Sequence, residues 1–125
     1  MKILLVDDDS FLLDMYANKF TASKHAVDST KSVEGALEKL RGGNTYDAVL
    51  LDMVLPNMTG VDLLKVVQNE KLGGAAKFIV LSNQSDDHDR KAALEAGAAG
   101  YIIKAEMIPS EVVTAVEGII GGSHT

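Results

Sequence analysis

Short apolar runs of strand length alternate with longer segments of helical periodicity along the chain. The runs cover residues 3–6, 25–29, 47–51, 78–81 and 101–103. Each run is followed by a segment in which apolar residues recur at the three- and four-residue spacing of a helix face. Because strands that alternate with helices form parallel sheets, the pattern predicts an α/β fold of five βα units, with helices on both faces of a five-stranded parallel sheet.

Cap and turn residues mark the boundaries of these units, and the length of the chain indicates one domain. Ser32 predicts the start of the second helix, and Gly42 and Gly43 predict its end. The chain has 125 residues, a length typical of one domain, and it contains no internal repeat or low-complexity stretch. We therefore expect one domain over residues 1–120 and a flexible tail over residues 121–125.

The composition argues against several classes of protein. The absence of cysteine excludes disulfide scaffolds, thiolate metal sites and cysteine nucleophiles. With 18 acidic against 12 basic residues, the formal charge of −6 argues against binding to a nucleic-acid backbone. No apolar run approaches the roughly 20 residues of a membrane span, and the first run stops after four residues at three acids, unlike a signal peptide. We expect a cytoplasmic protein that binds neither membranes nor nucleic acid.

Polar residues stand at the carboxyl ends of four predicted strands. The strand-end residues are Asp7, Asp8 and Asp9 after the first strand, Asp52 after the third, Ser82 after the fourth and Lys104 after the fifth. Taken singly, each type is common as a helix cap, a turn residue or a solvated charge. In open parallel sheets, however, these ends meet at one edge, where ligands bind. Crowded carboxylates require a cation, and a hard divalent ion such as Mg2+ fits them.

Phosphoryl transfer onto a carboxylate is the chemistry that these groups support. Asp and Glu carboxylates accept phosphoryl groups covalently. The loose transition state spreads charge over three equatorial oxygens, so catalysis is mainly positioning and electrostatic stabilisation. A metal ion held by Asp7 and Asp8, the ammonium of Lys104 and the hydroxyl of Ser82 would each cover one of those oxygens.

Longer motifs extend this pattern over nearly the whole chain. The motifs are Ile-Leu-Leu-Val-Asp7-Asp8-Asp9, Asp52-Met-Val-Leu-Pro56-Asn-Met-Thr-Gly60, Phe78-Ile-Val-Leu-Ser82, Ala96-Gly-Ala-Ala-Gly-Tyr101 and Ile-Ile-Lys104. In this order, from Lys2 to about Ile120, the chain resembles the receiver domains of two-component response regulators, most closely the single-domain, chemotaxis-type members. The resemblance implies a flavodoxin-like, doubly wound (βα)5 three-layer sandwich with strand order 2-1-3-4-5.

The resemblance also implies how the acidic residues divide their roles. It makes Asp52 the phosphoryl acceptor. Asp8 and Asp52 would bind Mg2+ directly, together with the backbone carbonyl of Val54, and Asp7 would act on the metal through water. The reaction would be a self-catalysed phosphorylation and dephosphorylation of the chain, so we do not expect an enzyme that turns over an external substrate.

Signalling roles follow from the same resemblance. Lys104 would pair with the phosphoryl oxygens, Ser82 would shift toward them, and Tyr101 would turn inward as the switch aromatic. The phosphoryl donor would be a phosphohistidine of a sensor histidine kinase or a histidine phosphotransfer protein. The fourth helix, fifth strand and fifth helix would form the face that engages a downstream protein or output domain, and that face is a candidate homodimer interface.

Two residues depart from the family pattern. Ala105 stands where a Pro, often in a cis bond, usually follows the Lys. Because a non-Pro cis bond costs about 2.5–4 kcal/mol, we expect a trans bond and an altered loop after Lys104. Asn83 stands where a small residue is common, while Val54 and Gln84 occupy positions that tune the lifetime of the phosphorylated state in the family.

The residues leave three alternative functions open. Asp7-x-Asp9 is also the motif of haloacid dehalogenase-type phosphatases, although the chain has no cap domain and Asp52 would then be unexplained. A flavodoxin-like FMN carrier needs a phosphate-binding loop after the first strand, where this chain has three carboxylates that would repel phosphate. A degenerate receiver would bind partners without phosphorylation, and Ala105 keeps this alternative open.

Overall fold

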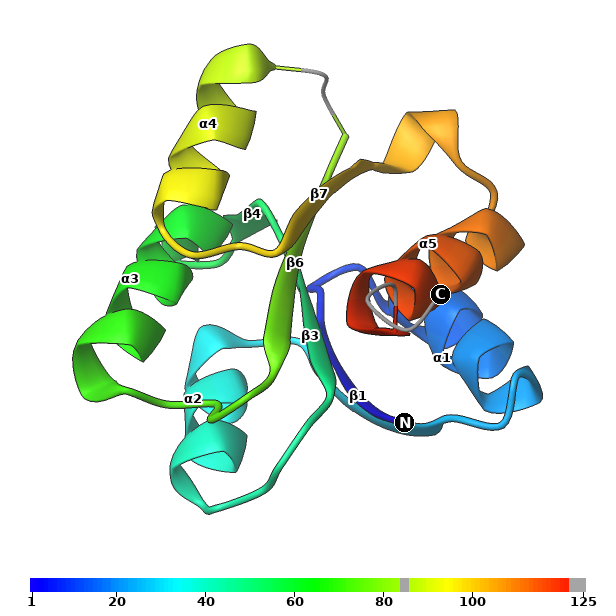
Figure 1. Ribbon diagram of the computed structural model, residues 1–125, viewed down its shortest axis with the longest axis horizontal. Coiled ribbons are helices and arrows are strands. Elements are labelled where there is room, and N and C mark those ends of the chain that lie inside the picture. Colours follow the sequence, from blue (N-terminus) through cyan, green and yellow to red (C-terminus); the bar gives the residue numbers. More distant parts are fainter. Residues whose placement is uncertain (84–85, 122–125) are drawn as a thin grey trace.

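Five parallel strands form the central sheet of the computed structural model, which describes residues 1–83 and 86–121 (Figure 1). The strands are β1 (Lys2–Val6), β2 (Ala26–Thr30), β3 (Ala48–Asp52), β6 (Lys77–Ser82) and β7 (Gly100–Ile103). A separate hairpin pairs β4 (Val54–Leu55) with β5 (Met58–Thr59). The helices are α1 (Ser10–Ala22), α2 (Val33–Arg41), α3 (Gly60–Glu70), α4 (Asp87–Glu95) and α5 (Pro109–Gly121), with a 3-10 turn, η1 (Lys104–Glu106), before α5.

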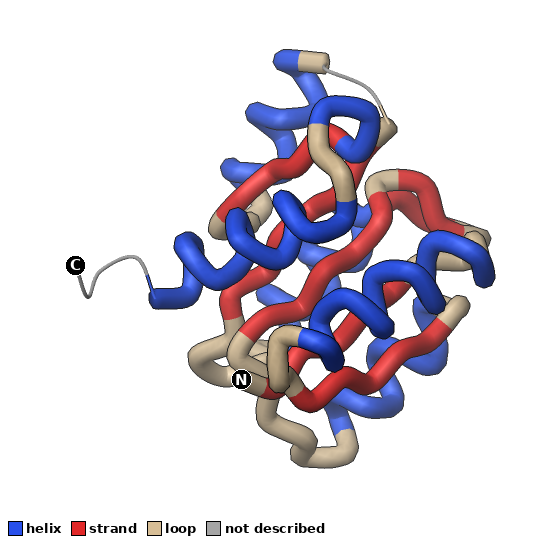
Figure 2. The backbone as a smooth tube through the Cα atoms, turned by 90° about the vertical axis from the view of Figure 1, so that its right-hand side faces the viewer, coloured by secondary structure: helices blue, strands red, loops and turns tan. Residues whose placement is uncertain are grey.

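The strand order confirms the predicted topology. It runs β2-β1-β3-β6-β7, which is 2-1-3-4-5 for the five main strands. Helices α1 and α5 cover one face of the sheet, and α2, α3 and α4 cover the other (Figures 1 and 2). The chain reverses its direction of winding between β1 and β3, and ligands bind at such a switch point in doubly wound sheets. The fold therefore directs attention to the carboxyl ends of β1 and β3.

Two apolar clusters, one on each side of the sheet, explain the continuous apolar runs in the sequence. Successive residues of a strand point to opposite faces. Ile3 and Leu5 accordingly pack with α1 and α5, whereas Leu4 and Val6 pack with α2 and α3. All five residues of β3 are buried. Such strands, covered on both faces, read as unbroken apolar runs instead of alternating ones.

Side-chain caps start the helices where the sequence places them. The predicted cap at Ser32 is confirmed, because its hydroxyl accepts a hydrogen bond from the Gly35 N–H at 3.0 Å. At α3, the Thr59 hydroxyl accepts from the Asp62 N–H and the Asp62 carboxylate accepts from the Thr59 N–H, which forms a capping box. These caps satisfy N–H groups that have no partner within the helix.

The hairpin of β4 and β5 is an element that the sequence pattern did not predict. It replaces an expected loop, because two-residue strands are too short to leave a periodic signal. Pro56 and Asn57 form its turn, and Asn57 has a φ of 76°, in the left-handed region that Asn tolerates. The hairpin connects the end of β3 to the start of α3 and so shapes the chain directly after Asp52.

The carboxyl end of the described chain is helical. Helix α5 continues to Gly121, and the expected flexible tail otherwise falls on residues 122–125, which lie outside the described residues. Within residues 1–83 and 86–121, none of the helices has the length and apolar character needed to cross a bilayer.

Candidate functional site

An acidic cluster lies at the carboxyl ends of β1 and β3. Asp7, Asp8 and Asp52 each bring a carboxylate oxygen within 4.8 Å of the other two. Asp7 is 2 % exposed and Asp52 is 8 % exposed, whereas Asp8 faces solvent. The cluster forms because β1 and β3 are neighbours in the sheet, in register from Ile3 opposite Ala48. Two carboxylates are thus buried side by side, an arrangement that is stable only when cations or hydrogen bonds compensate.

Lys104 provides the cation inside the protein. Its Nζ lies 3.0 Å from Asp7 Oδ2 and 3.3 Å from Asp52 Oδ1, and its side chain is only 6 % exposed. Burial alone would lower the pKa of Lys104, but the hydrogen bond to Asp7 and the charges of Asp52 and Asp7 outweigh it, so the pKa lies above its ordinary value. Lys104 is therefore a charged, well-anchored group.

The residue after Lys104 does not prevent this contact. The described residues contain no cis peptide bond, so the expected trans bond to Ala105 is confirmed. The chain enters the 3-10 turn η1 directly at Lys104. Lys104 thus reaches both carboxylates with Ala105 in place of the expected proline.

Burial dominates the electrostatics of Asp52. Desolvation raises the pKa of its carboxyl, Lys104 lowers it, and the neighbouring Asp7 raises it again. The backbone N–H of Val54 lowers the pKa slightly, but the net result lies above the ordinary value of a carboxyl group. The charged form of Asp52 is therefore under-compensated in the protein alone, as expected of a site that receives a further cation.

The acidic triplet after β1 divides into three different environments. Asp7 enters the cluster, and its Oδ1 accepts a hydrogen bond from the Asp9 N–H at 2.9 Å. Asp9 caps α1, with its carboxylate accepting from the N–H groups of Phe11 and Leu12. Aspartate is common as a helix cap, and of the three residues in this triplet Asp9 takes that role.

Ser82 and Tyr101 lie on the two neighbouring strands β6 and β7. Ser82 ends β6, is 4 % exposed and follows Leu81, which is in register with Asp52. Tyr101 lies in β7, half-buried against the cluster of residues on the α2 and α3 side. Asn83 is exposed, while Gln84 lies outside the described residues. Ser82 therefore stands at the same edge of the sheet as the acidic cluster.

Tyr16 was absent from the predicted site. Its phenol is 3 % exposed on the inner face of α1, and the charges of Lys104, Asp7 and Asp52 all act on it. The only sequence signal was its position on the apolar stripe of the helix, which indicates burial but not proximity to charged groups at the ends of distant strands.

Gly60 fixes the backbone behind Asp52. Its N–H donates to the Met53 carbonyl at 2.7 Å, and a Cβ atom at this position would lie 2.7 Å from the Asp52 carbonyl oxygen and 3.2 Å from the Met53 Cα. Neither backbone atom can rotate away. Only glycine therefore allows the start of α3 to lie this close to the end of β3.

Gly60→Ala is expected to lower the free energy of unfolding by about 1–3 kcal/mol, because the methyl group forces backbone atoms apart. Gly118→Ala is the matched control: Gly118 lies exposed within α5, nothing lies within 4 Å of its added Cβ, and alanine there should stabilise by about 0.5–1 kcal/mol. Urea unfolding of both variants measures the difference. Equal stabilities of the Gly60 variant and the wild type would contradict the close approach.

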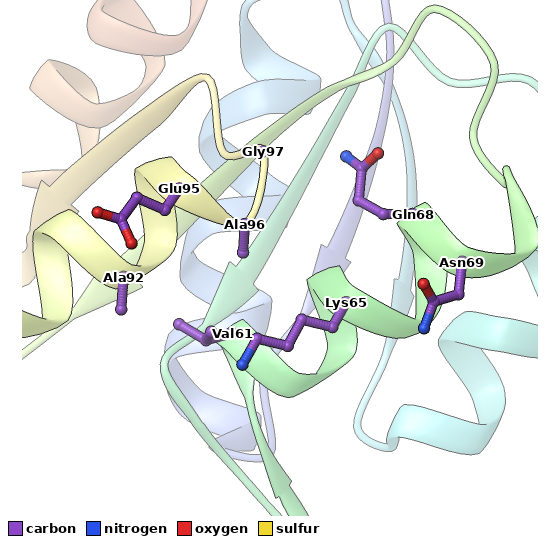
Figure 3. A pocket seen from close by; sticks show the side chains of 8 residues that line it. All are labelled: Val61, Lys65, Gln68, Asn69, Ala92, Glu95, Ala96 and Gly97. Atoms are coloured by element: carbon purple, nitrogen blue, oxygen red, sulfur yellow. The ribbon is translucent and has the colours of Figure 1, made fainter.

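A groove of about 640 Å3 lies elsewhere, between α3 and α4 (Figure 3). It is lined by Val61, Lys65, Gln68, Asn69, Ala92, Glu95, Ala96 and Gly97. None of these residues belongs to the acidic cluster. The groove between α3 and α4 is therefore separate from the acidic cluster that carries the candidate site residues.

The donor set of the cluster fits a hard divalent cation. It offers carboxylate oxygens from Asp7, Asp8 and Asp52, with one ammonium to balance three acids. Oxygen ligands of this kind suit Mg2+, which is held by one or two carboxylates and keeps several waters. The exposed carboxylate of Asp8 leaves one side of the cluster open to solvent.

Comparison with known proteins gives a consistent result. Residues 3–117 match the model of the response regulator receiver domain family. The response regulator ArlR of Staphylococcus saprophyticus is 32 % identical over 103 residues, covering 82 % of this chain and 45 % of ArlR. The chain thus spans about half the length of ArlR and of the transcriptional regulatory protein ResD of Bacillus subtilis.

Solved structures show the same fold. A putative response regulator from Chloroflexus aurantiacus superposes with a TM-score of 0.85 at 31 % identity, covering 96 % of this chain and 97 % of that one. The BeF3-activated receiver domain of DrrB superposes with a TM-score of 0.80 at 25 % identity, covering 95 % and 96 % of the two chains.

Proposed function

The chain belongs to the response regulator receiver family, and on that premise we propose that it accepts a phosphoryl group on Asp52 in a Mg2+-dependent reaction. A receiver domain is a component of two-component signalling and not a classical enzyme. The observation that carries the proposal is a buried Asp52 carboxylate that shares one cluster with Asp7 and Asp8 and is contacted by Lys104. A carboxylate so placed is both shielded from bulk water and surrounded by the groups that phosphoryl transfer requires.

Each group in the cluster has a role in this proposal. Asp8 and Asp52, with the backbone carbonyl of Val54, would hold Mg2+, and Asp7 would act on it through water. When bound, the ion would offset the negative charge of the phosphoryl oxygens. A carboxylate oxygen of Asp52 attacks the phosphorus of a phosphohistidine, the P–N bond breaks, and its electron pair returns to the imidazole.

Lys104 and Ser82 would bind the transferred group. Lys104 already contacts Asp52 Oδ1 at 3.3 Å, so a small movement would bring its ammonium onto a phosphoryl oxygen. Ser82 would donate its hydroxyl to another oxygen, and Tyr101 on the neighbouring strand would turn inward as Ser82 moves. The face of α4, β7 and α5 would then engage a downstream protein, an output domain or a second copy of the chain. We place this exchange in the cytoplasm, where a sensor kinase supplies the phosphohistidine.

Three exposed apolar side chains follow strand ends that lead to the site and suit the docking of that donor protein. Phe11, Val54 and Ile108 are 75 %, 72 % and 62 % exposed, respectively. Each follows the carboxyl end of a strand that carries a site residue: β1, β3 or β7. Exposed apolar residues grouped around a polar site are typical of protein-binding surfaces.

Incubation of the chain with acetyl phosphate and Mg2+ tests the proposal. We expect the mass of the protein to increase by one phosphoryl group, with an adduct that hydroxylamine releases because it is an acyl phosphate. EDTA should prevent the reaction. If no adduct forms at saturating Mg2+ and acetyl phosphate, the proposed function is wrong, and a receiver that works without phosphorylation becomes the better interpretation.

Ile108→Asp tests the docking surface. We expect it to slow phosphoryl transfer from a phosphorylated histidine phosphotransfer protein that labels the wild type by about tenfold, since loss of one central apolar contact costs more than 1 kcal/mol. Its rate with acetyl phosphate should stay at the wild-type value. Leu94→Asp is the matched control, because Leu94 is also exposed but lies on α4. Equal transfer rates for Ile108→Asp and Leu94→Asp would remove Ile108 from the docking surface.

A further inference from the structure

The hydroxyl of Tyr16 is a polar group that the proposed reaction does not use. Tyr16 is 3 % exposed, and its phenol makes no hydrogen bond with the described part of the chain. No completely buried side-chain nitrogen or oxygen lacks a hydrogen bond among the described residues, so the phenol oxygen must still touch a space that water can enter. A buried tyrosine normally finds a partner for its hydroxyl.

The packing of Tyr16 places its side chain on the α1 and α5 side of the sheet. It belongs to the apolar cluster that contains Leu5, Leu50 and Ile102. Leu50 lies two positions before Asp52 on β3, and side chains two apart on a strand point to the same face of a sheet. Leu5 and Ile102 lie near the ends of β1 and β7, which lead directly to Asp7 and Lys104. The ring therefore lies on the face of the sheet to which the Asp52 side chain points.

The charged groups of the site affect the pKa of the Tyr16 phenol. Burial is the main cause that raises the pKa of Tyr16, Lys104 lowers it, and Asp7 and Asp52 raise it. Lys104 is the strongest of the three charged neighbours. The pKa of the phenol is therefore affected by the ammonium of Lys104 as well as by the two carboxylates.

Lys104 has one donor left for such a neighbour. An ammonium carries three N–H donors, and Asp7 and Asp52 take two of them. The backbone after Lys104 is not held by a proline ring, because Ala105 follows in the 3-10 turn. A third hydrogen bond would therefore fix the direction of the ammonium beyond what its two carboxylate contacts do, and groups too far apart for direct contact commonly share a water.

We propose that Tyr16 is a positioning residue for Lys104: the third N–H of the ammonium donates to one bridging water, this water donates to the phenol oxygen, and the link keeps Nζ over Asp52. The inference rests on the proposed function, because the value of a fixed Lys104 lies in its contact with the phosphoryl group. It assigns a role to this chain's own tyrosine, which lies on α1 and outside the strand-end residues.

Tyr16→Phe removes the oxygen and keeps the ring, and Tyr46→Phe is the matched control. Tyr46 is also buried, at 6 % exposure, but its hydroxyl donates to Asp28 at 2.7 Å, on the β2 side of the fold. The first readout needs no metal: the NMR signal of the Lys104 ammonium in 15N-lysine-labelled protein. We expect faster proton exchange and a broader signal in Tyr16→Phe, and no change in Tyr46→Phe. An unchanged Lys104 signal in Tyr16→Phe would overturn the proposal.

The second readout is a double-mutant cycle. In the presence of Mg2+, Tyr16→Phe should weaken beryllofluoride binding about threefold to tenfold, the effect of one lost hydrogen bond. In a Lys104→Met background the same change should have no further effect, because Tyr16 acts through Lys104. Equal losses in both backgrounds would overturn the positioning role. Since the wild type and Tyr46→Phe are measured alongside, failure of this inference is distinguished from failure of the wild type to bind at all.

Discussion

Asp52→Asn is expected to abolish labelling by acetyl phosphate. An amide oxygen shares its electrons with nitrogen and carries no negative charge, so it does not attack phosphorus and cannot form an acyl phosphate. Asparagine has nearly the same shape as aspartate, so the buried site should stay folded. Intact-protein mass spectrometry with Mg2+ should show no adduct. Asp14→Asn, which changes an exposed carboxylate on the outer side of α1, should be labelled at the wild-type rate.

Asp7→Asn separates this expectation from the phosphatase alternative. A haloacid dehalogenase-type enzyme would use Asp7 as its nucleophile, so Asp7→Asn would stop labelling and Asp52→Asn would not. In a receiver, Asp7→Asn should only weaken the metal site, and higher Mg2+ should restore part of the rate. The structure already weighs against the phosphatase, because the carboxylate of Asp9 caps α1 and does not join the cluster. Labelling that depends on Asp7 and not on Asp52 would reverse this conclusion.

The topology could be predicted because each part of it leaves a local signal. Strands buried on both faces appear as unbroken apolar runs such as 3–6, and caps such as Ser32 mark helix starts. The rule that ligands bind at the carboxyl ends of parallel strands then places the acidic residues together. The hairpin around Pro56 could not be predicted, because its strands have two residues each and pair only with each other.

The contacts within the site depend on distances that no local pattern encodes. Lys104 is 97 positions from Asp7, and only the packed sheet shows that its ammonium lies 3.0 Å from that carboxylate. Because Ala105 stands where proline is usual, we expected an altered loop after Lys104, and the turn η1 that follows leaves the contact with Asp7 in place. His25 on the turn before β2 is likewise bonded to Glu117 on α5, 92 positions away. Such pairs follow from tertiary packing and not from sequence periodicity.

Without metal, Asp52→Asn is expected to raise the melting temperature. The pKa of Asp52 lies above its ordinary value, mainly because of burial and despite Lys104, so the folded protein binds this proton more tightly than the unfolded chain does. The stability that Asp52 contributes is then present below its ordinary pKa of 3.8 and is lost as pH rises through the higher value in the folded state. At neutral pH the buried charge of Asp52 destabilises the folded state. Asparagine carries no charge, so we expect the free energy of unfolding to rise by roughly 1 kcal/mol.

The dependence on pH and metal makes this prediction specific. The advantage of Asp52→Asn in EDTA should be largest near pH 7 and should disappear below pH 3.8, where both proteins are neutral at this position. Mg2+ should reverse the order, because a ligand that binds the folded state stabilises by about 2.7 kcal/mol at 100 times its dissociation constant, and the variant has lost a metal-binding oxygen. Thermal unfolding at two pH values, with EDTA or Mg2+, measures all four cases. A melting temperature of Asp52→Asn below that of the wild type in EDTA at pH 7 would show that Lys104 compensates the buried carboxylates fully, and that the cluster does not require a further cation.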